Sequence, residues 1–106
     1  MIKYKTEWEY HTIYHYIIIE GDKVIGSCNV EISGDYTKLQ SLFIQDEYRK
    51  MGYATQIIKE IINDFDDDIW LLVYKNNTPA ISLYNKLGWV DEYDEDEEKK
   101  WMIKCV

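Results

Sequence analysis

Residues 39–65 read LQSLFIQDEYRKMGYATQIIKEIINDF, and this stretch decides the fold class. Residues 39–45 form an apolar strand pattern. Beyond a short polar loop, the apolar residues of 54–65 recur at i, i+3, i+4, i+7, i+8 and i+11, a spacing that predicts an amphipathic helix. Residues 69–74 are then continuously apolar, which is typical of a strand covered on both faces. A strand, a helix and a second strand in this order predict a right-handed parallel crossover.

The segments on either side of this unit predict further strands and one more helix. Before it, apolar and polar residues alternate, and turn signals at Gly21 and Gly34 separate the strands. The expected strands cover 13–20, 24–32 and 38–45, and after the unit 89–93 and 99–106. Thr78, as the N-cap, and Pro79 predict the start of the second helix, which Gly88 ends. We therefore expect an α/β fold (mixed α+β), with a mostly antiparallel sheet, a central parallel strand–helix–strand unit and helices packed on it.

The charge balance argues against two large classes of partner. The chain has 106 residues, of which 20 are acidic and 12 are basic, giving a net charge of −8. Nucleic acids and anionic membranes are bound by basic surfaces, so neither partner is expected. No apolar run approaches the roughly 20 residues of a membrane span, and residues 1–10 lack the apolar core of a signal peptide. Cys28 and Cys105 fit no metal-ligand spacing, which favours reduced thiols in the cytoplasm and no bound metal.

The loop at 46–54 has the features of an anion-binding site. Gly52 and Ala54 stand at the start of the predicted helix, where backbone N–H groups point outward and the helix carries a partial positive charge. Arg49, the one arginine of the chain, and Lys50 add formal charge there. The alternative is that Gly52 marks only a tight turn and Arg49 is a surface cation. The Gly-x-Gly-x-x-Gly and Gly-Lys-Ser/Thr patterns of other nucleotide sites are absent.

Residues 49–54, RKMGYA, resemble the Arg/Gln-x-x-Gly-x-Gly/Ala loop of the GNAT acetyltransferases. The resemblance implies that this loop holds the pyrophosphate of acetyl-CoA, the co-substrate. It also implies that the backbone of the preceding strand pairs with the pantetheine arm. The cofactor-binding residues implied by these two features are Leu42, Phe43, Ile44, Arg49, Lys50, Met51, Gly52, Tyr53 and Ala54.

A second block, 77–89, is similar to the family pattern Asn-x-x-Ala-x-x-x-Tyr-x-x-x-Gly-Phe, with Trp89 in place of the Phe. The resemblance implies that Asn77 contacts the cofactor near its pantetheine. It further implies that Tyr84 donates a proton to the departing CoA thiolate, a role that suits a phenol with an ordinary pKa near 10. Taken alone, Tyr84 would be interpreted as a half-buried aromatic of an amphipathic helix.

The chain departs from the family pattern at its N-terminal end. Family members usually have two helices between the first and second strands, and at most twelve residues precede the strand at 13–20. We therefore expect a minimal member without those helices. An uncovered acceptor side predicts a homodimer, in which a second chain supplies the pocket wall. The alternative is that the aromatic segment 1–10 adds a strand over the gap.

The general base is a second departure. Members often place a Glu at the positions of Gln40 and Leu72, and neither of these side chains accepts a proton. The sequence leaves open, as substitutes, a water chain, an acceptor of low pKa, or one of four side chains, which are Glu31, Asp35, His15 and Glu92. A backbone N–H near Ile44 is expected to stabilise the oxyanion.

The acidic segment 91–98 has two compatible interpretations, a solvated hairpin tip or a rim that attracts a cationic acceptor. The sequence as a whole predicts an acyl-CoA-dependent N-acetyltransferase that is a single domain over residues 1–106. It would move an acetyl group directly from acetyl-CoA to a primary amine of a small molecule, peptide or protein. Two alternatives stay open, a non-catalytic acetyl-CoA-binding module and an acidic interaction or inhibitor protein that binds a basic partner.

Overall fold

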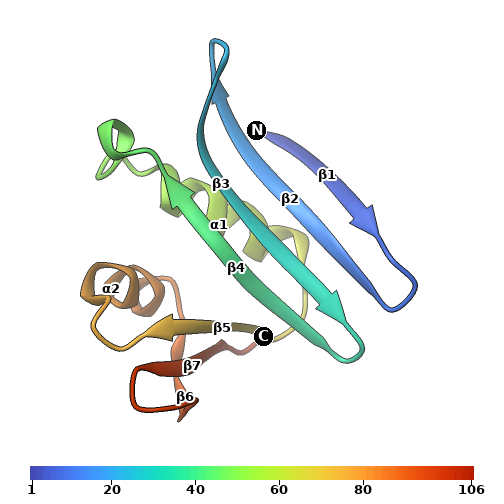
Figure 1. The fold of residues 1–106 in the computed structure, drawn as a ribbon, viewed down its shortest axis with the longest axis vertical. Coiled ribbons are helices and arrows are strands. Elements are labelled where there is room, and N and C mark those ends of the chain that lie inside the picture. Colours follow the sequence, from blue (N-terminus) through green and yellow to red (C-terminus); the bar gives the residue numbers. More distant parts are fainter.

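A computed structural model describes residues 1–106 as a seven-stranded sheet with two α-helices (Figure 1). The strands are β1 (Ile2–Glu7), β2 (His11–Glu20), β3 (Lys23–Ser33), β4 (Tyr36–Ile44), β5 (Ile69–Tyr74), β6 (Val90–Asp94) and β7 (Lys99–Lys104). The helices are α1 (Tyr53–Asp64) and α2 (Thr78–Lys86), and a single 3₁₀ turn, η1 (Asp46–Tyr48), precedes α1. Neither helix is long and apolar enough to cross a membrane.

The order of strands in the sheet is β1-β2-β3-β4-β5-β7-β6. Every neighbouring pair is antiparallel except β4 and β5, which are parallel and are joined through α1. The mostly antiparallel sheet with one central parallel crossover is therefore confirmed. β1 runs directly into β2 through a turn at residues 8–10, with no helix between them. The N-terminal segment thus forms an edge strand, as the alternative interpretation expected.

One face of the sheet carries the core. Helix α1 packs on β2, β3 and β4, and in Figure 1 it lies behind these strands. Its buried residues are Ile57, Ile58 and Ile61. They share one apolar cluster with Val30 of β3 and Tyr84 of α2, so both helices contribute to the same core. We call the opposite side of the sheet, on which no helix packs, the open face.

Two local predictions were wrong, each for a definable reason. The alternation of residues along the predicted strand 24–32 places Ile25 with Ser27 and Asn29, on the face opposite Cys28, yet Ile25 and Cys28 are both fully buried. The register shifts there, because Ile18 pairs with Gly26 and Ile19 with Val24, and this bulge turns Ile25 into the core.

The second helix begins one residue earlier than predicted. Its N-cap is Asn77, not Thr78, and the Asn77 side-chain oxygen accepts a hydrogen bond from the Ala80 N–H at 3.4 Å. Pro79 is accordingly the second helical residue, where its missing N–H costs no helical hydrogen bond.

Candidate active site

The two parallel strands separate soon after they pair. β4 and β5 are in register only at Thr37 with Ile69 and at Lys38 with Trp70, and Figure 1 shows them diverging from there. We call the diverging parts, 39–44 of β4 and 71–74 of β5, the fork. The outer edges of the two strands are paired with β3 and β7. The edges that face each other across the fork therefore offer free backbone N–H and C=O groups, which an extended ligand can pair with.

A bulge in β4 shapes one side of the fork. The register against β3 shifts between Ser27, opposite Phe43, and Asn29, opposite Gln40. Within the bulge Ser41 has a positive φ of 58°, an unusual backbone conformation for a residue with a side chain. Such a bulge redirects the backbone groups around it.

The end of β4 presents a backbone donor and acceptor to the fork. The Gln45 N–H donates to the Ile25 carbonyl of β3 at 2.9 Å. Because backbone groups alternate along a strand, the N–H and C=O of Ile44 face the other edge. The Arg49 Nε–H donates to that Ile44 carbonyl at 3.1 Å, which leaves the Ile44 N–H for a ligand.

The loop after β4 ends in an uncapped helix N-terminus. Lys50 has a φ of 61° and Gly52, the N-cap of α1, a φ of 87°. No side chain caps the helix, and its first turn contains no acidic residue. The first helical hydrogen bond runs from the Gln56 N–H to the Gly52 carbonyl at 3.0 Å, so the N–H groups of 53–55 precede it and are available to an anion.

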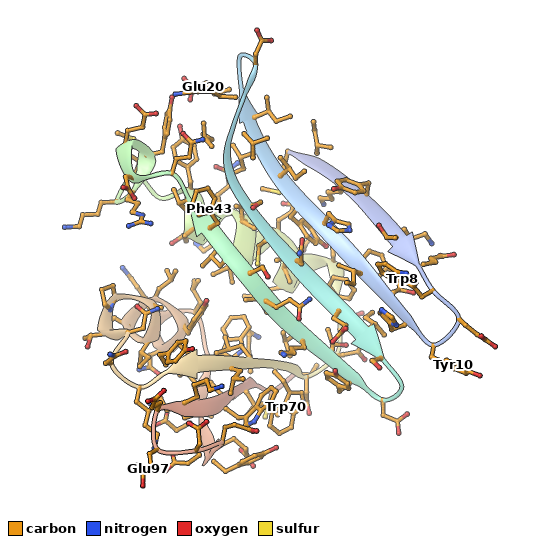
Figure 2. All side chains as sticks on the ribbon, viewed as in Figure 1. Trp8, Tyr10, Glu20, Phe43, Trp70 and Glu97 are labelled. Carbon is orange, nitrogen blue, oxygen red and sulfur yellow. The ribbon has the colours of Figure 1, made fainter.

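The side chains of the loop are partly occupied by its own acidic residues. Arg49 contacts Asp46 at 3.1 Å, and Lys23 contacts Glu47 at 2.8 Å. All four of these side chains are more than half exposed, so each pair is weak and open to exchange with a ligand. Lys50 and Met51 are exposed and point away from the core. A hollow of about 440 Å³ at the end of β4 is lined by Phe43, Gln45, Asp46 and Glu47, and Figure 2 shows Phe43 standing at that end of the strand.

Tyr84 lies on the core side of the β4 bulge. It is 7% exposed, and its ring packs against that of Trp89, with centroids 5.9 Å apart. Burial, with a smaller contribution from the neighbouring Cys28 thiol, raises the pKa of Tyr84 to about 12. The Cys28 sulfur in turn lies 3.4 Å from the carbonyl oxygen of Gln40, at the edge of the bulge. The phenol therefore keeps its proton at neutral pH, close to the fork.

None of the candidate general bases lies free beside the fork. Gln40 lies opposite Asn29 on the open face, and Asn29 accepts a hydrogen bond from the His15 Nδ1–H at 3.1 Å. The other ring nitrogen of His15 lies 3.1 Å from the Thr6 hydroxyl on β1, on the side away from the fork. Tyr4 stacks on the same imidazole at 4.3 Å, so His15 is held as a structural residue.

The acidic candidates are also remote or engaged. Glu31 accepts a hydrogen bond from the Tyr36 hydroxyl at 3.0 Å, and Asp35 is exposed at the turn between β3 and β4. Glu92 is exposed on β6. The structure thus brings together the β4 segment, the loop and Tyr84 around the fork, with Asn77 at the start of α2, and leaves the proposed bases outside it.

Sequence reasoning missed an aromatic cluster on the open face. The rings of Trp70 and Trp101 lie 6.4 Å apart and those of Trp70 and Tyr93 6.2 Å apart. The three residues come from β5, β7 and β6, and Lys38 of β4 places its ammonium 5.2 Å above the Trp101 ring. The one signal in the sequence was the spacing of two residues between Trp70 and Leu72, which places these two side chains on the same face of β5.

Comparison with known proteins gives one family match. The family described as "Acetyltransferase (GNAT) family" matches residues 1–89 of the chain. An N-alpha-acetyltransferase of Saccharolobus solfataricus is 39% identical over 54 residues, which cover 46% of this chain and 32% of the relative. The chain therefore spans about a third of the length of that curated relative.

Solved structures agree on the fold. A PaiA N-acetyltransferase from Thermoplasma acidophilum in complex with coenzyme A superposes with a TM-score of 0.79 at 20% identity, covering 92% of this chain and 62% of that one. The ribosomal-protein-S18-alanine N-acetyltransferase of Escherichia coli superposes with a TM-score of 0.76 at 17% identity, covering 94% of this chain and 72% of that one. At these identities the likeness establishes the shared fold.

Proposed function

The chain belongs to the GNAT acetyltransferase family, and from that premise we propose that it transfers an acetyl group from acetyl-CoA directly to a primary amine. The observation that carries the proposal is the fork between β4 and β5, which opens onto the uncapped N-terminus of α1. A long ligand with an amide-bearing arm and an anionic end fits these two features in that order. Free strand edges suit the arm, and free helix N–H groups suit the diphosphate.

The residues present fit such a co-substrate. Leu42 and Ile44 would pair with the arm through their backbone, Phe43 between them would contact it through its exposed side chain because its backbone faces β3, and 49–54 would hold the diphosphate. A Cβ built on Gly52 meets no atom within 4 Å, so space beside its backbone is open to a phosphate. Asn77 has its side-chain oxygen engaged by Ala80, which leaves its amide N–H₂ for the ligand. Bound there, acetyl-CoA supplies an acetyl group activated as a thioester.

Tyr84 is proposed to donate a hydrogen bond to the sulfur as the thiolate leaves. With its pKa raised to about 12 by burial, the phenol is always protonated in the working range. Complete transfer of its proton to a thiolate of pKa near 8.5 is uphill by about 5 kcal/mol, at about 1.4 kcal/mol per unit. The side chain therefore stabilises the developing charge, and the proton that finally reaches the sulfur comes from the amine through solvent.

The acceptor amine must reach the fork neutral. An alkyl ammonium of pKa near 10.4 requires about 4–5 kcal/mol for deprotonation at pH 7. Since neither Gln40 nor Leu72 takes a proton, water on the open face is the proposed acceptor for it. The Ile44 N–H, which faces the fork, is the proposed donor to the carbonyl oxygen as negative charge develops on it.

Three further features belong to the proposal. Residues 1–106 act as a single acetyltransferase domain, and its compartment is the cytoplasm, which suits the free thiols of Cys28 and Cys105. Two copies associate through the open face, where Ile2 and Tyr4 are each about half exposed.

The proposal is tested by incubating the chain with acetyl-CoA and a panel of amines while free thiol is measured. Thiol release that depends on the amine, with an acetylated product of the expected mass, supports it. Acetyl-CoA binding without thiol release would favour the non-catalytic module, and no binding at all would favour the acidic interaction protein.

A further inference from the structure

The aromatic cluster of the open face has the chemistry of an ammonium site. Trp70, Tyr93 and Trp101, which we call the box, present three rings at interplanar angles of 57° and 82°. Ring faces attract cations, and Trp does so most strongly. The box already holds one, since the Lys38 ammonium lies 5.2 Å over the Trp101 ring. Figure 2 shows Trp70 among side chains of the lower strands, and the exposed β6–β7 loop with Glu97 beyond them.

The carboxylate next to the box reinforces this preference. Glu95 accepts a hydrogen bond from the Trp101 indole N–H, which fixes the ring and brings a negative charge to its edge. Other acidic residues of the loop are neutralised by lysines: Asp91 by Lys100 at 2.8 Å and Asp94 by Lys75 at 2.9 Å. Glu95 forms no ion pair, so its charge is available to a ligand.

The cation in the box is replaceable. Lys38 has no carboxylate within ion-pair distance, and it is held only by the ring. Directly opposite it on β3 stands Glu31, at cross-strand distance. A ligand ammonium entering the box can displace Lys38 toward Glu31, so the displaced charge gains a partner.

The box adjoins the fork on the open face of the sheet. Trp101 pairs with Leu72 of β5, whose open-face side chain borders the fork. With strands about 4.8 Å apart, the Trp101 ring lies roughly 10 Å, about two strand spacings, from the middle of the fork. An alkyl chain with an amine at each end spans such a distance.

We propose that the preferred acceptor of the proposed acetyl transfer is a linear diamine or polyamine, whose far ammonium occupies the box formed by Trp70, Tyr93 and Trp101. The near amine, deprotonated, forms the N–C amide bond as the C–S bond breaks, and one of its protons ends on the sulfur. Lys38 acts as the internal occupant that the substrate replaces. This proposal rests on the proposed function for its catalytic part, and its binding part is measured separately.

Binding is tested by titrating hexamethylenediamine into ¹⁵N-labelled protein without acetyl-CoA and following the four indole N–H signals. The signals of Trp101 and Trp70 should move and saturate. Those of Trp8, at the β1–β2 turn, and of Trp89, which is 1% exposed, serve as internal controls and should stay. Shifts confined to Trp8, or no saturable shift, would overturn the box as an ammonium site.

Selectivity is tested by comparing hexamethylenediamine with hexylamine, which has the same length and one amine. Trp101→Leu should raise the KM for the diamine about tenfold more than the KM for hexylamine, the size of a cation–π contact of roughly 1.4 kcal/mol. Lys38→Met should lower the KM for the diamine, because it empties the box. Tyr93→Leu, at a half-exposed position, repeats the test should Trp101→Leu fail to fold. Trp8→Leu is the matched control.

The outcomes separate this proposal from the proposed function. Indole shifts with no acetylation of any amine would sustain the box and refute the acetyl transfer. Equal acetylation of both amines, with no indole shift, would refute the box and sustain the transfer. A basic peptide that is acetylated with a lower KM than the diamine would overturn the assignment of a small-molecule acceptor.

Discussion

Replacing Gly52 by Asp should abolish tight acetyl-CoA binding while costing little stability. Gly52 has a φ of 87°, and an added Cβ meets nothing within 4 Å. The structural penalty is therefore only that of a left-handed backbone, about 1 kcal/mol, which lowers Tm by about 4–8 °C in a domain near this size. The new carboxylate, however, would stand beside the free N–H groups at the start of α1.

The loss of binding can be estimated from Coulomb's law. Two unit charges about 4 Å apart repel by about 1 kcal/mol in bulk water and by about 4 kcal/mol at an effective dielectric of 20. A half-exposed loop lies between these limits, and about 2–3 kcal/mol corresponds to a 30- to 150-fold rise in the Kd for acetyl-CoA. Isothermal titration calorimetry measures this Kd, and a thermal melt measures the stability.

Gly34→Asp is the matched control for that variant. Gly34 also has a positive φ, 56°, and a Cβ there also meets nothing within 4 Å, but it lies in the turn between β3 and β4 at the far end of the sheet. It should lose about as much stability and retain its affinity. If both variants fold and bind acetyl-CoA equally well, the diphosphate does not lie on the N-terminus of α1.

Four further results are expected. Tyr84→Phe should lower kcat about tenfold or more and leave the Kd for acetyl-CoA unchanged, because the hydroxyl acts only as the thiolate leaves. Because burial raises the pKa of Tyr84 to about 12, the kcat of the unmutated protein should not fall between pH 7 and about 10 in stopped-time assays. A fall in kcat over this range would contradict the proposal that Tyr84 acts as a protonated donor. Tyr16→Phe should lower the free energy of unfolding by about 1.5 kcal/mol in urea titrations, since the Tyr16 hydroxyl donates to Asp64 at 2.8 Å. Burial opposes the ionisation of Asp64, but hydrogen bonds from Lys3 and Tyr16 hold the pKa of Asp64 below its ordinary value. The stabilisation by the ionised Asp64 is therefore fully present at pH values above the ordinary pKa, and it should fade as the pH falls through the lowered pKa. Light scattering across a concentration series should give a dimer mass, and a monomer at high micromolar concentration with full activity would refute association through the open face.

Much of the fold followed from local patterns in the sequence. The helix spacing of 54–65 and the apolar run of 69–74 each reproduce an element to within a residue, because each depends on which side chains face one core. The bulge that buries Ile25 was not predictable, since it depends on the pairing register of two strands and not on the residues of either. The observed N-cap of α2 is Asn77 and not the predicted Thr78, because Asn and Thr are both good N-caps and the turn before α2 selects between them.

The candidate site was predictable in its parts and not in its assembly. The loop and Tyr84 were proposed because two short motifs resemble those of the family, whereas the fork arises because β4 and β5 pair only at their beginnings. The box unites side chains from three strands, and no local signal brings Trp70 next to Tyr93. The contact between Arg49 and Asp46 was also unforeseen, because acidic residues beside an anion loop do not reveal which cation they hold.

The most direct test is to map the backbone amide signals of the protein as acetyl-CoA is added. The amides of 42–44 and 49–55 should shift together, with that of Ile44 among the largest, while those of β1 and β2 stay unchanged. A separate cavity of about 420 Å³ lies between the β1–β2 edge and the end of α1, lined in part by Lys3, Tyr14 and Phe65. Shifts that cluster around this cavity and spare the fork would contradict the placement of acetyl-CoA between β4 and β5.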